Sequence, residues 1–215
     1  MKVKVKDKII ELEPNSKPML FKRIIADGTD IAAVFLIFML LTALILKTPI
    51  ASVYNGHFEK YRSMETAAVE KYAGDYEKAG KELSDSDEYR NERFAAELHG
   101  YLLRALAISI SEALILLIIP LANKDRSTFG KRLAGILLFS EKSYSKATAF
   151  QVWMRFLFIL LFDSMLLYLL TGIYTFLLVP VLRLTEMLLN KENKTLCDAL
   201  TGIKIIEKLS YDGIN

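Results

Sequence analysis

The feature that most constrains this chain is a set of long apolar runs. They occupy Ile31–Leu46, Tyr101–Ala122 and an almost unbroken stretch from Val152 to Leu189. The hydrocarbon core of a bilayer is crossed by about 20 predominantly apolar residues in a helix. A buried helix of a globular protein rarely carries so many apolar residues on all of its faces. The runs therefore predict an integral membrane protein rather than a soluble helical domain.

The composition agrees with this interpretation. Hydrophobic residues make up 53% of the 215 residues and charged residues 25%. A chain of this size has little room for both a water-soluble core and a polar coat, so the two kinds of residue must be segregated. They are, because the segments between the apolar runs are rich in Lys, Glu, Asp and Ser.

The number of spans follows from the lengths of the runs. The first reaches bilayer length when it is extended upstream, since Ile24–Leu46 gives about 34 Å as a helix. The last is too long for one span and contains Thr171-Gly172 near its midpoint, which predicts a tight turn between Val152–Leu170 and Ile173–Leu189. A single long tilted or re-entrant element is the alternative. We predict an all-α membrane protein built on a four-helix transmembrane bundle.

Lysine and arginine near the ends of spans predict the orientation, because they are enriched on the cytoplasmic side. The segment between the second and third spans is strongly basic, as is the N-terminal tail, whereas Lys47–Gly100 carries eight Lys and Arg against eleven Asp and Glu. The predicted segments are a cytoplasmic basic tail (1–22), the first span (23–46), an extracytoplasmic helical loop (47–100), the second span (101–122), a cytoplasmic loop with a short strand (123–151), the third and fourth spans (152–170 and 173–189) and a cytoplasmic C-terminal segment with a short strand (190–215).

The exported loop has a helical pattern. Aromatic and aliphatic residues recur in it at spacings of three and four, from Tyr54 to Leu83, which is typical of amphipathic helices. The cluster Ser84-Asp85-Ser86-Asp87 predicts the end of one helix and the cap of the next, which we expect to run from Glu88 into the second span. This describes an extracytoplasmic helical hairpin packed on itself, and the alternative is a surface that binds a partner through its tyrosines.

Two short segments on the predicted cytoplasmic side resemble each other. They are Leu133-Ala134-Gly135-Ile136-Leu137-Leu138 and Leu200-Thr201-Gly202-Ile203-Lys204-Ile205-Ile206. Both are rich in residues that favour strands and both follow a glycine, so we expect them to pair as a small cytoplasmic β element, joined by Val3, Val5 and Ile9 of the tail.

Ionisable residues inside the predicted spans carry the possible chemistry, because a charge in hydrocarbon is costly and is usually paired or faces a wet cavity. Arg23, Asp27 and Asp30 are spaced by four and three and therefore project from one face of the first helix. Depth at 1.5 Å per residue matches acids with bases, and predicts the ion pairs Asp27–Arg155–Glu186 and Asp30–Arg183. For Arg23 and Arg104 the alternative is that they reach out to the interfaces.

Glu112 and Asp163 lie deeper, about 15 Å from the predicted cytoplasmic ends. Because no basic residue matches their depth, we expect these carboxyls to be neutral, to share a proton or to bind a small cation, as proton-linked or sodium-linked transport requires. Pro120 and Pro180 would loosen the helices and admit water. The alternative is that the polar residues only hold the helices together.

Other chemistries find no support in the sequence. There is no nucleophile with a base, no glycine-rich phosphate loop, no metal-ligand cluster and no basic-aromatic pattern for nucleic acid, so we expect no enzyme, no cofactor, no metal and no nucleic-acid partner. Cys197 is the single cysteine, which excludes a disulfide within the chain.

An ordered set of motifs resembles the RDD family of bacterial membrane proteins. The set comprises Arg23-x-x-Ala26-x-x-x-Asp30, Thr128-Phe129-Gly130-Lys131-Arg132-Leu133-Ala134-Gly135, Arg155, and Leu196-Cys197-Asp198-Ala199-Leu200-Thr201-Gly202. The resemblance assigns the arginine and the two aspartates of the family's name to Arg23, Asp30 and Asp198. Cys197 stands where a histidine is common and Ile203 where a threonine is common. The resemblance also implies a bacterial cytoplasmic membrane protein, linked either to cation/proton exchange or to accessory roles beside other membrane machinery. We expect Asp198 to cap the C-terminal element or to pair with Lys131 or Arg132.

Two functions follow from these observations. The first is a small ion-coupled transporter or a subunit of one, which we expect to be oligomeric because four helices enclose little space. The second is a non-catalytic adaptor or regulatory subunit that binds an envelope, secretion or protease complex through the exported loop. The carboxyls within the spans favour the transporter, and the long tyrosine-bearing loop favours the adaptor.

Overall fold

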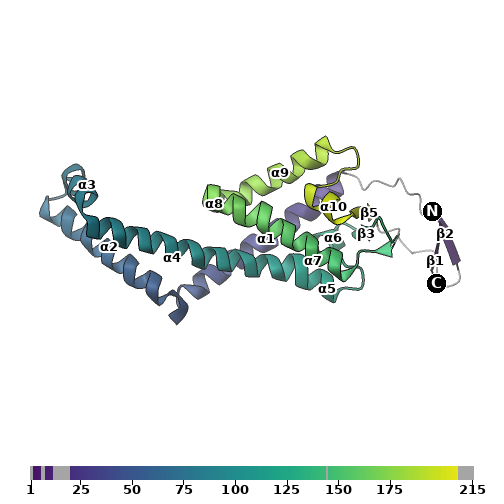
Figure 1. The fold of residues 1–215 in the computed structure, drawn as a ribbon, viewed down its shortest axis with the longest axis horizontal. Helices are drawn as coiled ribbons and strands as arrows, with labels where there is room; N and C mark the ends of the chain where they lie inside the picture. The colour runs from purple at the N-terminus through teal and green to yellow at the C-terminus, as the bar shows by residue number, and fades with distance from the viewer. Residues whose placement is uncertain (1, 6–7, 12–19, 144, 208–215) are drawn as a thin grey trace. The chain divides into compact units, whose positions relative to one another are not determined.

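The computed structural model describes residues 2–5, 8–11, 20–143 and 145–207, so the predicted tail and C-terminal segment lie partly outside it. The described chain is mostly helical (Figure 1). It forms two compact units, residues 1–35 with 112–215 and residues 36–111. The helix α1 (Leu20–Ile45) begins in the first unit and continues into the second, and α4 (Asp87–Glu112) ends where the second unit meets the first along the chain.

Three helical stretches among the described residues are long and apolar enough to cross a membrane. They are Leu20–Ile45, Asp87–Ala122 and Ala149–Leu189. Large apolar side chains are exposed on them, such as Leu36 and Leu177, as expected of helices whose solvent is lipid. The predicted membrane nature of the chain is thus confirmed by the length and composition of its helices.

Residues 36–111 contain a polar set of helices after the end of α1. The short 3₁₀ turn η1 (Pro49–Ala51) leads into α2 (Ser52–Lys71), which is followed by α3 (Tyr76–Asp85) and α4. The backbone of Ala73 and Gly74 has positive φ and separates α2 from α3. The Ser86 hydroxyl accepts a hydrogen bond from the backbone N–H of Tyr89 at 3.2 Å, so the predicted stop and cap between α3 and α4 are confirmed.

The helices α2 and α4 contact each other through polar side chains. The Tyr89 hydroxyl donates to Glu65 at 2.8 Å, and Glu92 contacts both His57 at 2.6 Å and Lys60 at 2.7 Å. We call α2, α3 and residues 87–100 of α4 the polar arm. The tyrosines of the predicted helical pattern differ in exposure, because Tyr61 is half-buried whereas Tyr76 is 76% exposed.

The first unit resumes at residue 112, the last residue of α4. The π-helical turn η2 (Ala113–Ile118) leads into α5 (Ile119–Ala122), followed by α6 (Phe129–Leu133) and then, after two strands, by α7 (Ala149–Phe158). A second π-helical stretch, η3 (Ile159–Leu166), connects α7 to α8 (Leu167–Thr171). The turn η4 (Gly172–Tyr174) precedes α9 (Thr175–Leu189), and α10 (Leu196–Thr201) follows. Gly172 has a φ of 58°, and α9 contacts both α8 and η3.

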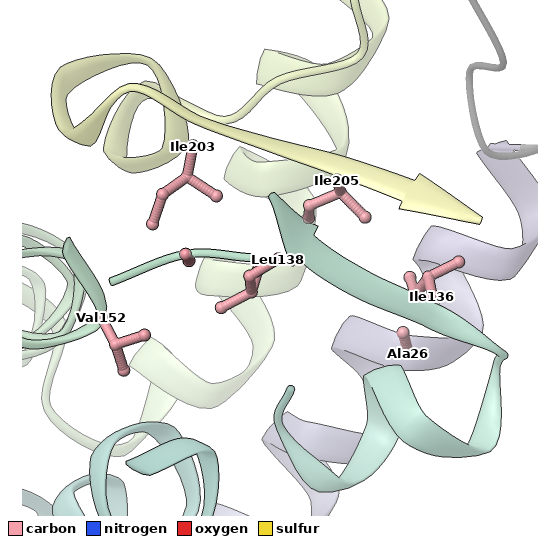
Figure 2. Close-up of a cluster of buried hydrophobic side chains, with 7 residues drawn as sticks. Ala26, Ile136, Leu138, Val152, Ile203 and Ile205 are labelled. Atoms are coloured by element: carbon pink, nitrogen blue, oxygen red, sulfur yellow. The ribbon is translucent and has the colours of Figure 1, made fainter. Parts of the chain in front are cut away.

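The two similar segments do pair, as predicted. Strand β3 (Ile136–Ser140) lies between β4 (Ser145–Lys146) and β5 (Ile203–Glu207), and β3 and β5 are antiparallel with Leu138 opposite Ile205. Figure 2 shows Ile136 and Leu138 of β3 beside Ile203 and Ile205 of β5, with Ala26 of α1 and Val152 of α7 in the same buried cluster. The sheet therefore packs directly on the start of α1.

The predicted joining of the tail to this sheet is wrong. Strands β1 (Lys2–Val5) and β2 (Lys8–Glu11) pair with each other instead, with Val3 opposite Ile10. Strands so close in sequence lose little chain entropy on pairing, which favours the local partner over a distant one.

Candidate functional site: a buried charge network

The site is built on one face of α1. Arg23, Asp27 and Asp30 are each at most 6% exposed, and Ala26 between them is fully buried. These charges require partners, because an unpaired charge away from water is strongly unfavourable. The partners come from α6 and α10, and α7 contributes a second base to α10.

The first partner is the short helix α6. Thr128 caps it and donates its hydroxyl hydrogen to Asp30, and the backbone N–H of Gly130 donates to the other carboxylate oxygen of Asp30 at 2.7 Å. The Lys131 Nζ lies 2.8 Å from Asp27 Oδ1 and 3.5 Å from Asp30 Oδ2. One buried lysine thus serves two aspartates of α1.

Glycine at position 130 permits this contact. A Cβ added there would lie 2.1 Å from the carbonyl oxygen of Ala26 and 3.0 Å from Asp30 Oδ1. Real Cβ atoms do not approach a backbone oxygen so closely, so any other residue would push α6 away from α1. The motif residues Ala26 and Gly130 therefore set the distance across which the charges meet.

The second partner is α10, which Thr195 and Asp198 cap reciprocally. Asp198 is fully buried and accepts a hydrogen bond from Arg23 Nη2 at 2.9 Å and from Arg155 Nε at 2.7 Å. Burial raises the pKa of the Asp198 carboxyl, but Arg155 and Arg23 lower it more, so the net pKa lies below its usual range. One buried aspartate thus serves two arginines.

The charges of this set are balanced. We call it the charge network, and it consists of Arg23, Asp27, Asp30, Lys131, Arg155 and Asp198. Its three bases face three acids, and the contacts join α1 to α6 and α10, and α7 to α10. Arg23 Nε is buried without a hydrogen-bond partner among the described residues, while its Nη2 is bonded. The network connects segments that are distant in the sequence. Its ion pairs therefore hold helices of this unit in contact with one another.

The residues of the family motifs were identified from the sequence, but the pairing between them was not. The structure corrects the ion pairs predicted from depth: Asp27 and Asp30 contact Lys131, and Arg155 contacts Asp198. Depth counted along helices ignored Lys131 and Asp198, because both lie on short helices outside the apolar runs. The alternative that Arg23 reaches out to the interface is also wrong, since its side chain is buried.

A repeat in the sequence contained a signal for these partners. Thr128 and Gly135 are seven residues apart, as are Thr195 and Gly202, and each threonine caps a short helix that its glycine follows. Lys131 and Asp198 both stand three residues after the capping threonine. The similarity recognised in the sequence began only at Leu133 and Leu200, so it missed these two positions.

The remaining predicted residues lie around the network. Arg183 of α9 is buried near Asp27, and Glu186 accepts a hydrogen bond from the backbone N–H of Leu196 at 3.0 Å. Arg132 is exposed and donates to Asn123 at 2.9 Å. Asp198 does cap α10, as expected, but its ionic partners are arginines rather than Lys131 or Arg132. Gly202 ends α10 with a φ of 62°.

Glu112 and Asp163 are placed at two π-helical stretches. Glu112 precedes η2, is 6% exposed and accepts a hydrogen bond from the Ser164 hydroxyl of η3. The backbone of Asp163 belongs to η3, and its side chain lies outside the described part of the structure. Ser164, which follows Asp163 in the chain, thus contacts Glu112.

The polar arm carries a separate cleft of about 1000 Å³. Side chains of α2, α3 and α4 line it, including the exposed aromatic residues Tyr76 and Phe94 and the arginines Arg62, Arg90 and Arg93. Across the described residues, no group of three or more His, Cys, Asp and Glu side chains is arranged to hold a metal ion.

The comparisons with known proteins give one match. A family model described as RDD family matches residues 17–202, which include every member of the charge network. No curated protein and no solved structure matches the chain.

Proposed function

The chain belongs to the RDD family, and from this premise we propose that it is a non-catalytic membrane adaptor or regulatory subunit. It binds a protein of an envelope, secretion or protease complex through its polar arm. The observation that carries the proposal is the cleft of the arm, which exposes Tyr76 and Phe94. Large aromatic side chains beside arginines are the composition that protein interfaces favour.

The pairing within the charge network supports this choice over transport through the family residues. A carboxylate that binds and releases a cation must exchange that cation with water or with another group. Asp27, Asp30 and Asp198 instead contact buried bases that belong to the same protein. These aspartates therefore serve to hold α1 against α6 and α10.

We place the adaptor in the bacterial cytoplasmic membrane with four spans and both termini in the cytoplasm. The positive φ of Gly172 and the contacts of α9 with α8 and η3 support a reversal of direction that divides Ala149–Leu189 into two spans. The polar arm, with its excess of acids, then forms a helical hairpin outside the cytoplasm, and the charge network and the sheet of β3, β4 and β5 lie on the cytoplasmic side.

Site-specific crosslinking tests the adaptor. A photoreactive amino acid is introduced at Phe94 or Tyr76 in the full chain and activated in intact cells, and the products are identified by mass spectrometry. Lys81 is the matched control, because it is exposed on α3 but does not line the cleft. We expect one stoichiometric protein partner from Phe94 and Tyr76 and not from Lys81. Products that contain only a second copy of the chain, or equal products from all positions, contradict the proposal.

A specific observation favours ion-coupled transport as the second candidate. Glu112 is a buried carboxyl in an apolar helix, it directly precedes the π-helical stretch η2, and it accepts a hydrogen bond from Ser164 of the π-helical stretch η3. Single π-helical turns are frequent at functional sites. In this candidate Glu112 and Asp163 bind a proton or a small cation, and the protein acts as a homo-oligomer.

Flux measurements separate the candidates. Full-length protein in proteoliposomes is compared with Glu112→Gln and Asp163→Asn under an imposed pH gradient. Ion-coupled transport predicts a pH-dependent cation flux that both substitutions abolish. A flux that the two variants leave unchanged, or no flux above empty vesicles, excludes this candidate.

A further inference from the structure

A second, much smaller cavity lies within residues 36–111, and it differs from the cleft of the polar arm. It has a volume of about 30 Å³ and is more enclosed than the cleft. That space corresponds to about one water molecule or one oxygen atom of a ligand. Its lining consists of Thr42, Ile45, Leu46, Tyr54, Gly100, Leu103 and Arg104.

Thr42 presents an unused hydroxyl to this cavity. Its Oγ1 is buried and makes no hydrogen bond with any residue that the structure describes. Several other helix hydroxyls bond to the carbonyl four residues earlier, as in Thr29 to Ile25 at 2.7 Å and Ser109 to Ala105 at 2.8 Å. A hydroxyl buried without such a bond is unfavourable unless a ligand or a water molecule accepts its hydrogen.

Arg104 supplies a positive charge at the same place. It is exposed and forms no ion pair with a described acid, whereas the arginines of the polar arm do, as with Arg93 and Glu97 at 2.8 Å. Gly100 brings the groups together: a Cβ there would lie 2.9 Å from the Tyr54 ring and 3.6 Å from Arg104 Nη2. A cation and a hydroxyl donor therefore converge on one small space.

The depth of the cavity indicates the kind of anion. The helical stretch Asp87–Ala122 has 36 residues and is about 54 Å long, whereas the hydrocarbon core is about 30 Å thick. Because the apolar part begins near Tyr101, Arg104 lies at the edge of that core. Thr42 stands three residues before the end of α1. Lipid phosphates are found at this boundary.

We propose that this cavity binds the phosphate group of a phospholipid. One phosphate oxygen enters the cavity and accepts hydrogen bonds from the Thr42 hydroxyl and the Arg104 guanidinium. The rest of the headgroup stays at the exposed side of Arg104, and the acyl chains lie along the apolar surface of α1 and α4. The site recognises a phosphodiester, whatever the headgroup attached to it.

Native mass spectrometry of the full chain in detergent tests the site with three lipids of identical acyl chains. We expect the protein to retain phosphatidylglycerol and phosphatidylethanolamine, which share the phosphodiester, and not diacylglycerol, which lacks it. Inorganic phosphate at millimolar concentration should not displace the lipid. Equal retention of diacylglycerol, retention of no lipid, or displacement by inorganic phosphate would overturn the proposal, and none of these results depends on a variant.

Substitutions locate the site. Thr42→Val and Arg104→Gln should each lower the retention of phosphatidylglycerol about tenfold, since each removes one hydrogen bond to a charged group. Thr29→Val on α1 and Arg93→Gln on α4 are the matched controls, because both side chains bond within their own helices. Equal retention by Arg104→Gln and Arg93→Gln places the lipid elsewhere and contradicts the assignment.

Discussion

The two segments that follow the capping threonines Thr128 and Thr195 have the same order of structural elements, but their corresponding buried residues carry opposite charges. Each is a short helix followed by a glycine with positive φ and then by a strand, and the two strands pair. The third residue of one helix is Lys131, which contacts two aspartates. The third residue of the other is Asp198, which contacts two arginines. Together they match the mixed charges of α1.

The difference between these two residues has an energetic consequence. Arginine keeps its charge under all ordinary conditions, so loss of Asp198 leaves two permanent charges buried. Loss of Lys131 leaves Asp30 with its hydrogen bonds from Thr128 and Gly130. The two halves of the charge network should therefore respond differently to substitution.

The largest effect is expected for Asp198→Asn. The amide keeps the size of the side chain but removes the charge that Arg23 and Arg155 require, so unfolding should become easier by about 3–5 kcal/mol. Thermal unfolding in a mild detergent measures the loss. Asp125→Asn is the control, because Asp125 pairs with Lys146 at the surface at 3.2 Å, and such pairs contribute at most about 1 kcal/mol. Equal effects of the two substitutions would show that the buried pairing of Asp198 stabilises the fold no more than a surface ion pair does.

The pH dependence of the unsubstituted protein follows from the same residue. Because the pKa of Asp198 is lowered in the folded state, its stabilisation is complete above the ordinary aspartate value of 3.8 and is lost as the pH falls below it. Stability attributable to Asp198, measured as the difference from Asp198→Asn, should be constant above that value. A decline that starts near neutral pH would contradict the pairing.

Lys131→Met should cost about 3 kcal/mol near neutral pH, since Asp27 and Asp30 lose their shared cation. This loss should be smaller than that of Asp198→Asn, because Asp30 keeps its hydrogen bonds from the Thr128 hydroxyl and the Gly130 N–H. Thermal unfolding of both variants measures the contrast, and a larger loss for Lys131→Met would refute it.

Gly130→Ala tests the close approach of α6 to α1. The added methyl group would meet the carbonyl oxygen of Ala26, so we expect a loss of about 1–3 kcal/mol from displacement of the helix. The corresponding residue of α10 is Cys197, which is buried and already carries a side chain. Cys197→Ala is the control, and its effect on thermal unfolding should be the smaller one. The opposite order would mean that α10, and not α6, is the helix that tolerates less change in its packing.

The smallest effect is expected at the two glycines that follow these helices. Gly135 and Gly202 have φ values of 65° and 62°, so alanine at either should cost about 1–2 kcal/mol of backbone strain. Gly56→Ala in α2 is the control, because its surroundings are open and alanine favours a helix by up to about 1 kcal/mol. Thermal unfolding of the three variants compares them, and clearly unequal losses at Gly135 and Gly202 would break the equivalence of the two segments.

The two segments also show how far sequence reasoning reaches. The strands after Gly135 and Gly202 were predicted, because the apolar and β-branched residues around each glycine are a local signal. Asp30 and Asp198 were identified by resemblance to the family. The partners of these acids were not found, because they are distant along the chain: Lys131 lies about 100 residues from the aspartates of α1, and Arg23 about 175 residues from Asp198.

The sequence by itself determined that this protein has membrane-spanning helices, where its polar arm begins, and that Arg23, Asp27 and Asp30 share a helix face. These features depend on apolar length and on a helical repeat, both of which are local. Only the tertiary structure decided which base each acid meets, because a buried charge takes the partner that packing brings within contact. The close contact of Gly130 with Ala26 brings Lys131 to α1, and no rule of spacing along the chain encodes that approach.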